Sequence, residues 1–355
     1  MTQDPSSQPL VSVLLPNMNN ATVLDDVLDK LAENTTYPNV ELIVADDGST
    51  DGSVEILRRW RDSGRFKQFL LLEREHAGII PTLNAALGEV GGEVIVRIDG
   101  DTTVETPGWL ERMLRFHLSD ERIGVTVAKV ILDDGRIHTF GVNVVGPEGL
   151  HDRGTRPSER PGRRTLNGPV DRPHEGEALD GDRPAEVDSA LGCWTMFSTE
   201  LARELGGFDL AYNPVWIEDV DFAFAVRARA GKKVFFLPDV RIIHHVGSRD
   251  QRLDASPVKR LVRRAGLRYG RALPDGLRFR VMRLARVGQQ DPKKLAVLQR
   301  HYAHWLAKWG FDPMNPDLDS VRDRYAGTEV WWAYDDERRR AGEEIIARYL
   351  ADAPA

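Results

Sequence analysis

The chain has 355 residues, of which 41% are hydrophobic and 29% charged, and its formal net charge is −7. This composition excludes a wholly disordered protein. The acidic balance argues against nucleic acid as a partner, because phosphate backbones are usually bound by a positive surface. One large α/β domain with an appendage, or two domains, would account for the length.

Two features bear on the compartment. Residues 1–9 are polar and lack the apolar core of a signal peptide, and no run reaches the roughly 18 to 20 apolar residues that span a bilayer. The only cysteine, Cys193, excludes an intrachain disulfide. We therefore expect a cytoplasmic protein with a flexible N-terminus over residues 1–9, which meets a membrane only peripherally.

The first third of the chain alternates short apolar runs with amphipathic patterns. The runs predict strands, and the three-and-four spacing of apolar residues predicts helices. The expected strands are 11–15, 40–45, 69–72 and 93–98, and the expected helices are 24–31, 54–60, 79–87 and 109–116. This alternation predicts an α/β fold with a mainly parallel sheet covered on both faces. Ligands bind such sheets beyond the carboxyl ends of the strands.

Beyond residue 121 the pattern changes. Residues 123–132 and 137–145, around a turn at 133–135, indicate hairpin-like strands. Residues 151–186 are rich in Pro, Gly and charge and indicate a long loop. Order is expected again over 187–197, followed by a helix from Thr199, a helix over 219–230, and strands at 234–237 and 240–245.

The last hundred residues are expected to be helical. One face of a predicted helix collects large apolar side chains, which are Leu295, Leu298, Tyr302, Trp305 and Trp309. Such a stripe usually packs into a core, and contact with a sugar or a lipid is the less common alternative.

Two acidic clusters follow predicted strands. Asp99 and Asp101 flank Gly100 after the fourth strand, where paired carboxylates suit Mg²⁺ or Mn²⁺ together with a substrate diphosphate. Asp-Gly-Asp is also a common turn. Asp46 and Asp47 follow the second strand, where a carboxylate can accept hydrogen bonds from a nucleobase or a ribose. The alternative for that segment is capping of the next helix by Ser49 or Asp51.

The order and spacing of these motifs resemble glycosyltransferase family 2. The segments that carry the resemblance are 11–19, 44–53, His76-Ala-Gly with Asn84, and Asp99-Gly-Asp101, and the similarity spans roughly residues 10–250. The resemblance implies a GT-A domain over 10–250, a Rossmann-like fold, and the apolar pattern predicts the helical region over 251–355. It also implies an inverting transferase that uses a nucleotide-diphosphate sugar, a divalent metal, and a sugar, glycolipid or other hydroxyl acceptor.

The resemblance also assigns a donor site. The residues it places beside the nucleotide sugar are Pro16, Asn19, Asp46, Asp47, Asn84, Asp99 and Gly100, with Asp99 and Asp101 also at the metal. His76 and the segment 82–84 depart from the family's usual Asn-x-Gly and Ala-Arg-Asn, so an arginine contact to phosphate is not expected there.

A second acidic pair, Glu218-Asp219, matches the position at which the family places its general base. An acceptor hydroxyl must lose its proton as it attacks, and a positioned carboxylate can take it. We expect Asp219 to be the base and Glu218 to contact the acceptor or orient the site. The alternative is that both are helix N-terminal charges that favour the dipole, which is the expected role of Asp221.

Three further residues complete the predicted site. The resemblance implies that His244 or His245 completes the metal's coordination or contacts the diphosphate. Strand alternation sends only one of them into the site, and we choose His244; the alternative is a partly buried structural histidine. Trp194 and Trp216 are expected on the acceptor side, although Trp194 and Cys193 have core packing as their alternative.

Other functions fit the sequence less well. A sugar nucleotidyltransferase would carry a Gly-rich segment after the first strand, where this chain has residues 16–20. A dehydrogenase would need G-x-G-x-x-G there. A non-catalytic protein that binds a nucleotide sugar remains an alternative, against which the pair Glu218-Asp219 argues.

Overall fold

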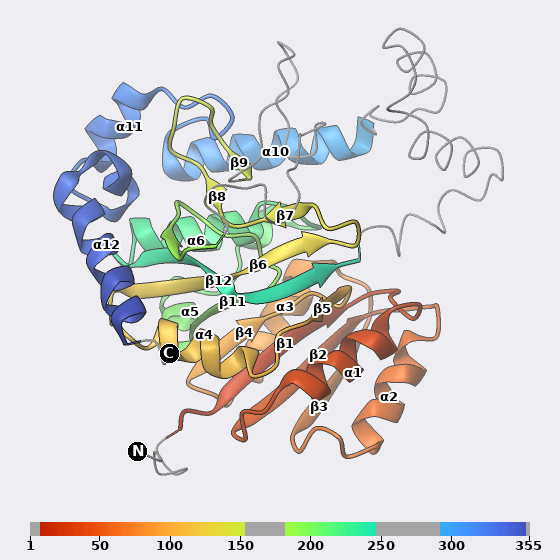
Figure 1. Ribbon diagram of the computed structural model, residues 1–355. Helices are drawn as coiled ribbons and strands as arrows, with labels where there is room; N and C mark the ends of the chain where they lie inside the picture. Colours follow the sequence, from red (N-terminus) through yellow and green to blue (C-terminus); the bar gives the residue numbers. More distant parts are fainter. Residues whose placement is uncertain (1–7, 153–181, 246–291, 353–355) are drawn as a thin grey trace, which may run out of the picture.

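A computed structural model describes residues 8–152, 182–245 and 292–352. A ten-stranded mixed sheet runs through the centre, with helices on both of its faces (Figure 1). The long loop expected at 151–186, most of the N-terminal segment 1–9 and the predicted boundary at residue 250 lie largely outside the described residues. Among the described residues, no helix combines the length and apolar character needed to cross a membrane.

The N-terminal half folds as the alternating pattern predicts. Its parallel strands are β1 (Val11–Asn17), β2 (Val40–Asp47), β3 (Phe69–Arg74) and β4 (Val94–Arg97), which lie in the order β4-β1-β2-β3. The helices are α1 (Leu24–Asn34), α2 (Ser53–Asp62), α3 (Ile79–Gly88) and α4 (Trp109–His117). Because the strands are parallel, their carboxyl ends share one edge of the sheet, and the acidic clusters meet there.

The second half extends the sheet with strands of mixed direction. The strand β6 (Ile123–Leu132) forms the expected hairpin with β7 (Ile137–Thr139), and β11 (Thr195–Ser198) lies antiparallel between β4 and β6. The two strands predicted over 234–245 are one strand, β12 (Lys233–His244), with a register shift between Leu237 and Arg241. The short strands β5 (Thr102–Val104) and β10 (Ala185–Glu186) pair with β12, whereas β8 (Val142–Asn143) and β9 (His151–Asp152) form a separate two-stranded sheet.

Two apolar cores lie on opposite faces of the sheet, because successive strand residues point to opposite sides. Along β1, Leu14 belongs to one core, while Val13 and Leu15 belong to the other. The first core also receives the helices α3, α5 (Thr199–Leu205) and α6 (Glu218–Ala228), and the second receives α1 and α4. The short helix η2 (Leu210–Tyr212) precedes α6.

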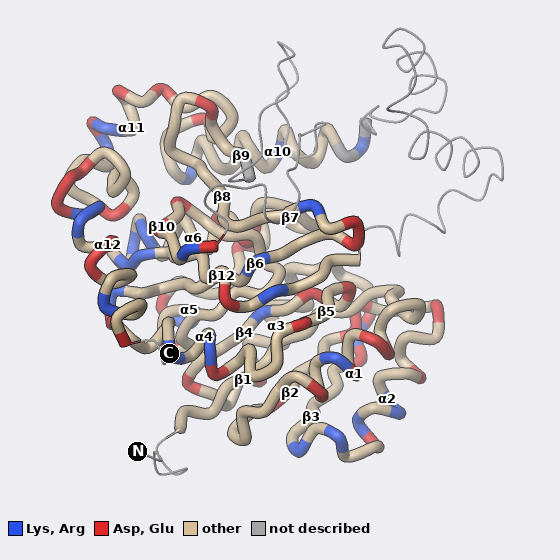
Figure 2. The backbone as a smooth tube through the Cα atoms, viewed as in Figure 1, with Lys and Arg blue, Asp and Glu red and all other residues tan. Residues whose placement is uncertain are grey.

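The C-terminal elements pack against both cores. They are α10 (Pro292–Trp309), α11 (Leu318–Tyr325), η4 (Glu329–Tyr334) and α12 (Asp336–Ala351), and in Figure 1 they run from the top of the view down one side. Trp305 and Trp309 of α10 are buried against Phe224 of α6, which confirms that the aromatic stripe is core. Leu295, which we expected on the same face, is 38% exposed. Charges of both signs lie on α1, α2 and α12 (Figure 2).

Candidate active site

Asp46, near the end of β2, holds the loop that follows this strand in place. Asp46 is buried and accepts hydrogen bonds from Asn17 Nδ2 at 2.7 Å, from the Ser49 amide at 2.8 Å and from Ser49 Oγ at 2.6 Å. Ser49 Oγ in turn accepts from the Asn19 amide. Neither capping residue expected for α2 fills that role at its N-cap position, which is Gly52 with a left-handed backbone. Asp51 instead accepts hydrogen bonds from Ser53 and the Ala21 amide.

The carboxylate of Asp47 likewise accepts hydrogen bonds from within the protein. Its carboxylate is buried and accepts from the amides of Ala77 and Gly78, at 2.7 and 3.0 Å, and from Thr82 Oγ1 at 3.0 Å. His76 Nδ1 lies 2.8 Å from Asp47 Oδ2, and the His76 side chain is 58% exposed. Asp47 thus ties the turn 76–78 and the start of α3 to the end of β2. Contact between Asp47 and a nucleoside stays a prediction.

The remaining expected donor residues are placed around this loop. Asn19 accepts from the Thr50 amide, and Pro16 is buried in β1. Gly100 is buried, and a Cβ there would lie 2.8 Å from Asn20 Nδ2 and 3.0 Å from the Pro16 carbonyl oxygen. The close approach of β1 therefore explains this glycine, and its burial gives no support to a ligand contact. The Asn84 side chain holds the backbone of Phe208 through two hydrogen bonds.

The metal-side residues meet where β5 returns along β12. Thr102 pairs with His244 in this antiparallel ladder, which brings Asp101 Oδ1 to 3.4 Å from His244 Nε2. Thr102 also donates to the Asp99 carbonyl, so the Asp-Gly-Asp segment is a turn that nonetheless presents its carboxylates together with a histidine. Asp99 is 25% exposed at its side chain, and its Oδ1 is buried without a hydrogen-bond partner.

His245 points elsewhere, as strand alternation requires. Its ring lies between Asp133 Oδ1, at 2.6 Å, and Thr103 Oγ1, at 3.1 Å. His244 is thus the histidine beside the Asp-Gly-Asp turn. Burial alone would lower the pKa of His244, but the carboxylates of Asp101 and Asp99 outweigh it and raise the pKa.

Arg97, which the sequence analysis did not single out, links the two halves of the site. It is 2% exposed, and its Nη2 lies 3.0 Å from Glu218 Oε1 and 3.8 Å from Asp99 Oδ1. Burial opposes its charge, but Glu218 and Asp99 raise the pKa of the guanidinium, which therefore stays protonated. A buried cation two residues before Asp99 was the available signal, because such a charge requires a partner.

The two acidic residues at the start of α6 differ in burial and in their hydrogen-bond partners. Asp219 is partly exposed, and its carboxylate is oriented by the amides of Gly192, at 2.6 Å, and Val220, at 2.8 Å. Glu218 is buried beside Arg97, and burial together with the Asp219 charge raises the pKa of Glu218 to about 7. Burial likewise raises the pKa of Asp99 against the opposing effect of Arg97.

Gly192 explains how these groups fit together. A Cβ at this position would lie 2.2 Å from Arg97 Cζ, so only glycine leaves room for the guanidinium while its amide orients Asp219. Arg97 thus joins Asp99 to Glu218, and the Gly192 amide beside Arg97 orients Asp219, so the metal side and the α6 side belong to one site.

The two tryptophans expected on the acceptor side differ. Trp194 is fully buried, donates to Thr102 Oγ1 at 2.7 Å and packs edge-on against Trp109, so its acceptor assignment was wrong. Trp194 lies in the turn before β11, and the full burial of its side chain leaves no face for a sugar. Cys193 is buried as well, and burial raises the pKa of its thiol. Trp216 is partly exposed, next to the acidic pair, and its role stays a prediction.

The donor set at the turn fits a hard divalent cation. The two carboxylates are suitable ligands for Mn²⁺ or Mg²⁺, and a neutral imidazole is a common metal ligand in proteins. The buried Oδ1 of Asp99 without a hydrogen-bond partner is the observation that supports this fit. Among the described residues, no group of three or more His, Cys, Asp or Glu side chains is arranged to hold a metal ion, so a cation at Asp99, Asp101 and His244 stays a prediction.

Comparison with known proteins gives consistent matches. Residues 12–163 match the family model described as Glycosyl transferase family 2. O-antigen biosynthesis protein RfbC of Myxococcus xanthus is 28% identical over 251 residues, which are 70% of this chain and 18% of that protein. Validoxylamine A glucosyltransferase of Streptomyces hygroscopicus subsp. limoneus is 28% identical over 231 residues, which are 63% of this chain and 49% of that protein. The chain thus spans half or less of these relatives' length.

Among solved structures, GalNAc-T7 with UDP, GalNAc and Mn²⁺ aligns with a TM-score of 0.50 and 16% identity, covering 67% of this chain and 44% of that one. At this identity the likeness concerns the fold, and it agrees with the GT-A architecture expected from the sequence.

Proposed function

We propose that this chain, whose residues 12–163 form a glycosyl transferase family 2 region, transfers a sugar from a nucleoside-diphosphate donor to an acceptor hydroxyl with inversion at the anomeric carbon. The coarser conclusion, that the protein is a glycosyltransferase, rests on the family and on its glycosyltransferase relatives. The proposal depends on one observation, the ion pairs of Arg97 with Asp99 and Glu218, which place the Asp-Gly-Asp turn beside the start of α6, where Asp219 follows Glu218. Polysaccharide, cell-envelope glycan or glycoconjugate synthesis is the context that we propose for the reaction.

Asp219 is the proposed base. Its carboxylate takes the proton of the acceptor hydroxyl while that oxygen forms its bond to the anomeric carbon. The bond from this carbon to the diphosphate breaks on the opposite face, and the diphosphate leaves with the electron pair. The amides of Gly192 and Val220 fix the orientation of Asp219, so the base needs little rearrangement before the reaction.

The metal side supports the leaving group. Asp99, Asp101 and His244 would hold Mn²⁺ or Mg²⁺, which when bound supplies Lewis-acid stabilisation of the departing diphosphate. Arg97 is too deeply buried to reach solvent, and its charge balances Glu218 and Asp99. Glu218 lies beside the base, and together with Arg97 it keeps the start of α6 close to the Asp-Gly-Asp turn.

Asp219→Asn tests the base. The substitution keeps the shape and one accepting oxygen but removes the proton acceptor, so we expect transfer to fall by about 10² to 10⁴-fold. Donor binding should persist, measured as the thermal shift given by UDP-, dTDP- or GDP-sugars with and without Mn²⁺. Asp26→Asn, at an exposed position of α1, is the control. Full activity in Asp219→Asn would remove the base assignment.

A further inference from the structure

The backbone that leads into α6 is strained. Trp216 and Ile217 have φ angles of 77° and 74°, and Ile217, the N-cap residue of α6, provides no side-chain cap. Non-glycine residues pay roughly 1 to 3 kcal/mol each for such conformations and keep them only where the surroundings enforce them. Because Glu218 and Asp219 follow directly, whatever holds this turn also determines where the proposed base lies.

The C-terminal helix α10 contacts this region through a buried ion pair. Lys308 Nζ lies 2.6 Å from Asp221 Oδ2 and 2.7 Å from Asp209 Oδ2, and thereby joins α6 to the segment before η2. Asp221 also accepts from Trp309 Nε1 and Tyr212 Oη, at 2.8 and 2.9 Å. Asp221 lies in the first turn of α6, as the sequence predicted, but it is 2% exposed and paired with Lys308.

The same helix supports the turn itself. Arg300 donates to the backbone carbonyl of Asn213, and the fully buried His301 packs edge-on against Tyr212. Asn213 Nδ2 donates to the Ala77 carbonyl at 3.0 Å, in the turn that Asp47 organises. Asn213, at the start of the segment that leads into α6, is therefore held between α10 on one side and the donor-side turn on the other.

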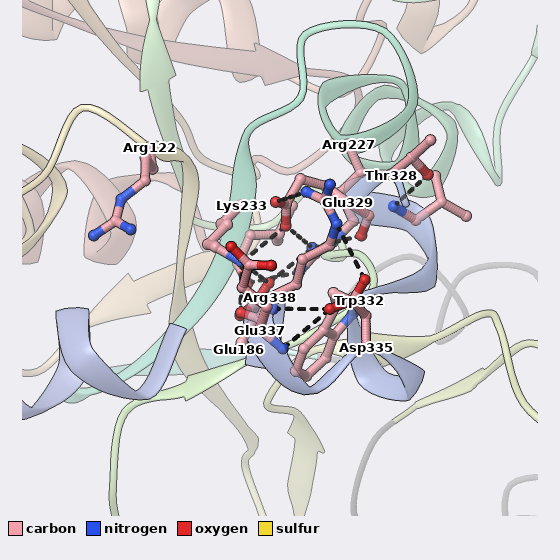
Figure 3. Close-up of polar contacts among 12 residues, drawn as sticks. Arg122, Glu186, Arg227, Lys233, Thr328, Glu329, Trp332, Asp335, Glu337 and Arg338 are labelled. Atoms are coloured by element: carbon pink, nitrogen blue, oxygen red, sulfur yellow. Dashed lines mark hydrogen bonds and ion pairs between the residues drawn. The ribbon is translucent and has the colours of Figure 1, made fainter. Parts of the chain in front are cut away.

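The far end of α6 is anchored as well, by the cluster in Figure 3. Arg227 is fully buried and reaches Glu186 Oε1 at 2.9 Å and the Glu329 carbonyl of η4 at 3.1 Å. Lys233 of β12 bonds Glu329 Oε2 at 2.8 Å, and Arg338 of α12 bonds Glu329 Oε1 at 2.7 Å. The C-terminal elements thus contact α6 through charged groups near both of its ends.

We propose that the C-terminal elements act as a clamp on α6, and that Lys308 is a positioning residue that sets the place of Asp219 through Asp221. This proposal rests on the proposed function, because the expected effect on catalysis requires that Asp219 is the base. Asp221 lies two residues after the base on the same helix, and Lys308 is 13% exposed, so solvent screens their ion pair only weakly. Loss of the link should let the start of α6 relax from its strained entry.

Lys308→Met is the main test. We expect kcat for sugar transfer to fall by about 10 to 100-fold, a range seen when a reacting group is misplaced by about 1 Å, while the Kd for the nucleotide sugar with Mn²⁺ changes less than about threefold. Lys308→Arg restores the charge and should recover most of kcat. Lys30→Met, the same change at an exposed position of α1, is the control. Wild-type kcat in a folded Lys308→Met protein would overturn the proposal.

A charge-balanced variant separates positioning from simple neutralisation. Lys308→Met leaves a buried Asp221 carboxylate without its cation, so that protein could fail to fold. Lys308→Met combined with Asp221→Asn removes both charges and should restore stability. The link between α10 and α6 is still weakened, so kcat should stay at least tenfold low. Wild-type kcat in this double variant would show that only neutralisation matters, and the positioning role would fall.

Hydrogen exchange keeps this test independent of the reaction. In Lys308→Met, amides over residues 216–221 should exchange at least tenfold faster than in the wild type, while those of α1 stay unchanged. Faster exchange with no transfer by the wild type on any donor would contradict the proposed function but not the clamp. Unchanged exchange over 216–221 would contradict the clamp, whether or not the protein transfers sugar.

Discussion

Two acidic regions follow strands of the same sheet, and they differ in how their oxygens are used. At the end of β2, Asp46 and Asp47 are saturated by donors from the protein, chiefly backbone amides and hydroxyls of the neighbouring turns. Near the end of β4, Asp99 keeps a buried Oδ1 that has no hydrogen-bond partner and lies 3.8 Å from Arg97 Nη2, and the buried Oε2 of Glu218 also has no hydrogen bond. Both regions appear in the sequence as carboxylates after a strand.

This difference distinguishes carboxylates that stabilise the structure of the site from carboxylates that take part in the proposed reaction. Saturated carboxylates contribute most to folding, because their charge is already solvated by fixed dipoles of the protein. Buried carboxylate oxygens without partners raise the energy of the unliganded protein and indicate a missing ligand. We therefore expect substitutions at β2 to change mainly stability and substitutions at Asp99 to change mainly activity.

The largest effect should come from Asp99→Asn. Removing one carboxylate from the proposed metal site should reduce transfer by more than about 10²-fold, since a cation supplies several kcal/mol to the transition state. The thermal shift that Mn²⁺ plus a nucleoside diphosphate produces in the wild type should disappear. Without ligands, the free energy of unfolding should stay within about 1 kcal/mol, since a neutral amide there avoids a poorly solvated charge.

Asp26→Asn on α1 serves as the control for both measurements. An Asp99→Asn protein that still transfers sugar at the wild-type rate, with an intact response to Mn²⁺, would contradict the division between the two regions.

Asp47→Asn should have the opposite profile. The amide lacks the charge and one of the accepting oxygens that serve Ala77, Gly78 and Thr82. Hydrogen bonds to charged groups contribute about 1.5 to 3 kcal/mol each, so we expect the free energy of unfolding to fall by about 2 to 3 kcal/mol in urea titrations. An unchanged unfolding free energy, with a lost thermal shift for nucleotides alone, would make Asp47 a ligand contact instead.

The two regions also show which features of the fold and site could be predicted from the sequence and which could not. Periodicity predicted the strands and helices of the N-terminal half and the burial of Trp305 and Trp309, because local patterns determine both. The order of the motifs predicted that Asp99, Asp101 and His244 lie together, and in the structure Asp101 Oδ1 is 3.4 Å from His244 Nε2. It could not show that Asp47 is saturated, since three of its donors lie 30 to 35 residues further along the chain.

The sequence also could not predict the direction in which several side chains point. Trp194 was expected at the acceptor, but it points into the core, where it donates to Thr102. Arg97 and Glu218 lie 121 positions apart, so no local pattern reveals that they pair. The same holds for Lys308 and Asp221, 87 positions apart, which the structure alone joins.

The effect most specific to the reactive region is the pH dependence of stability at Glu218. Burial and Asp219 raise its pKa to about 7 from an ordinary value of 4.5. A raised carboxyl pKa means that the folded protein holds a proton that the unfolded chain has already released, so Glu218 stabilises the fold fully below about pH 4.5. That contribution is lost as the pH rises through about 7.

Glu218→Gln cannot release a proton and removes this dependence. In EDTA, the free energy of unfolding of the wild type should therefore fall relative to Glu218→Gln between about pH 4.5 and 7. Its slope cannot exceed about 1.4 kcal/mol per pH unit, the value for one proton. Glu204→Gln, at an exposed position of α5, is the matched control. A difference that rises with pH over this interval would mean that Arg97 dominates and holds Glu218 ionised, and the contrast with the saturated pair at β2 would then disappear for this residue.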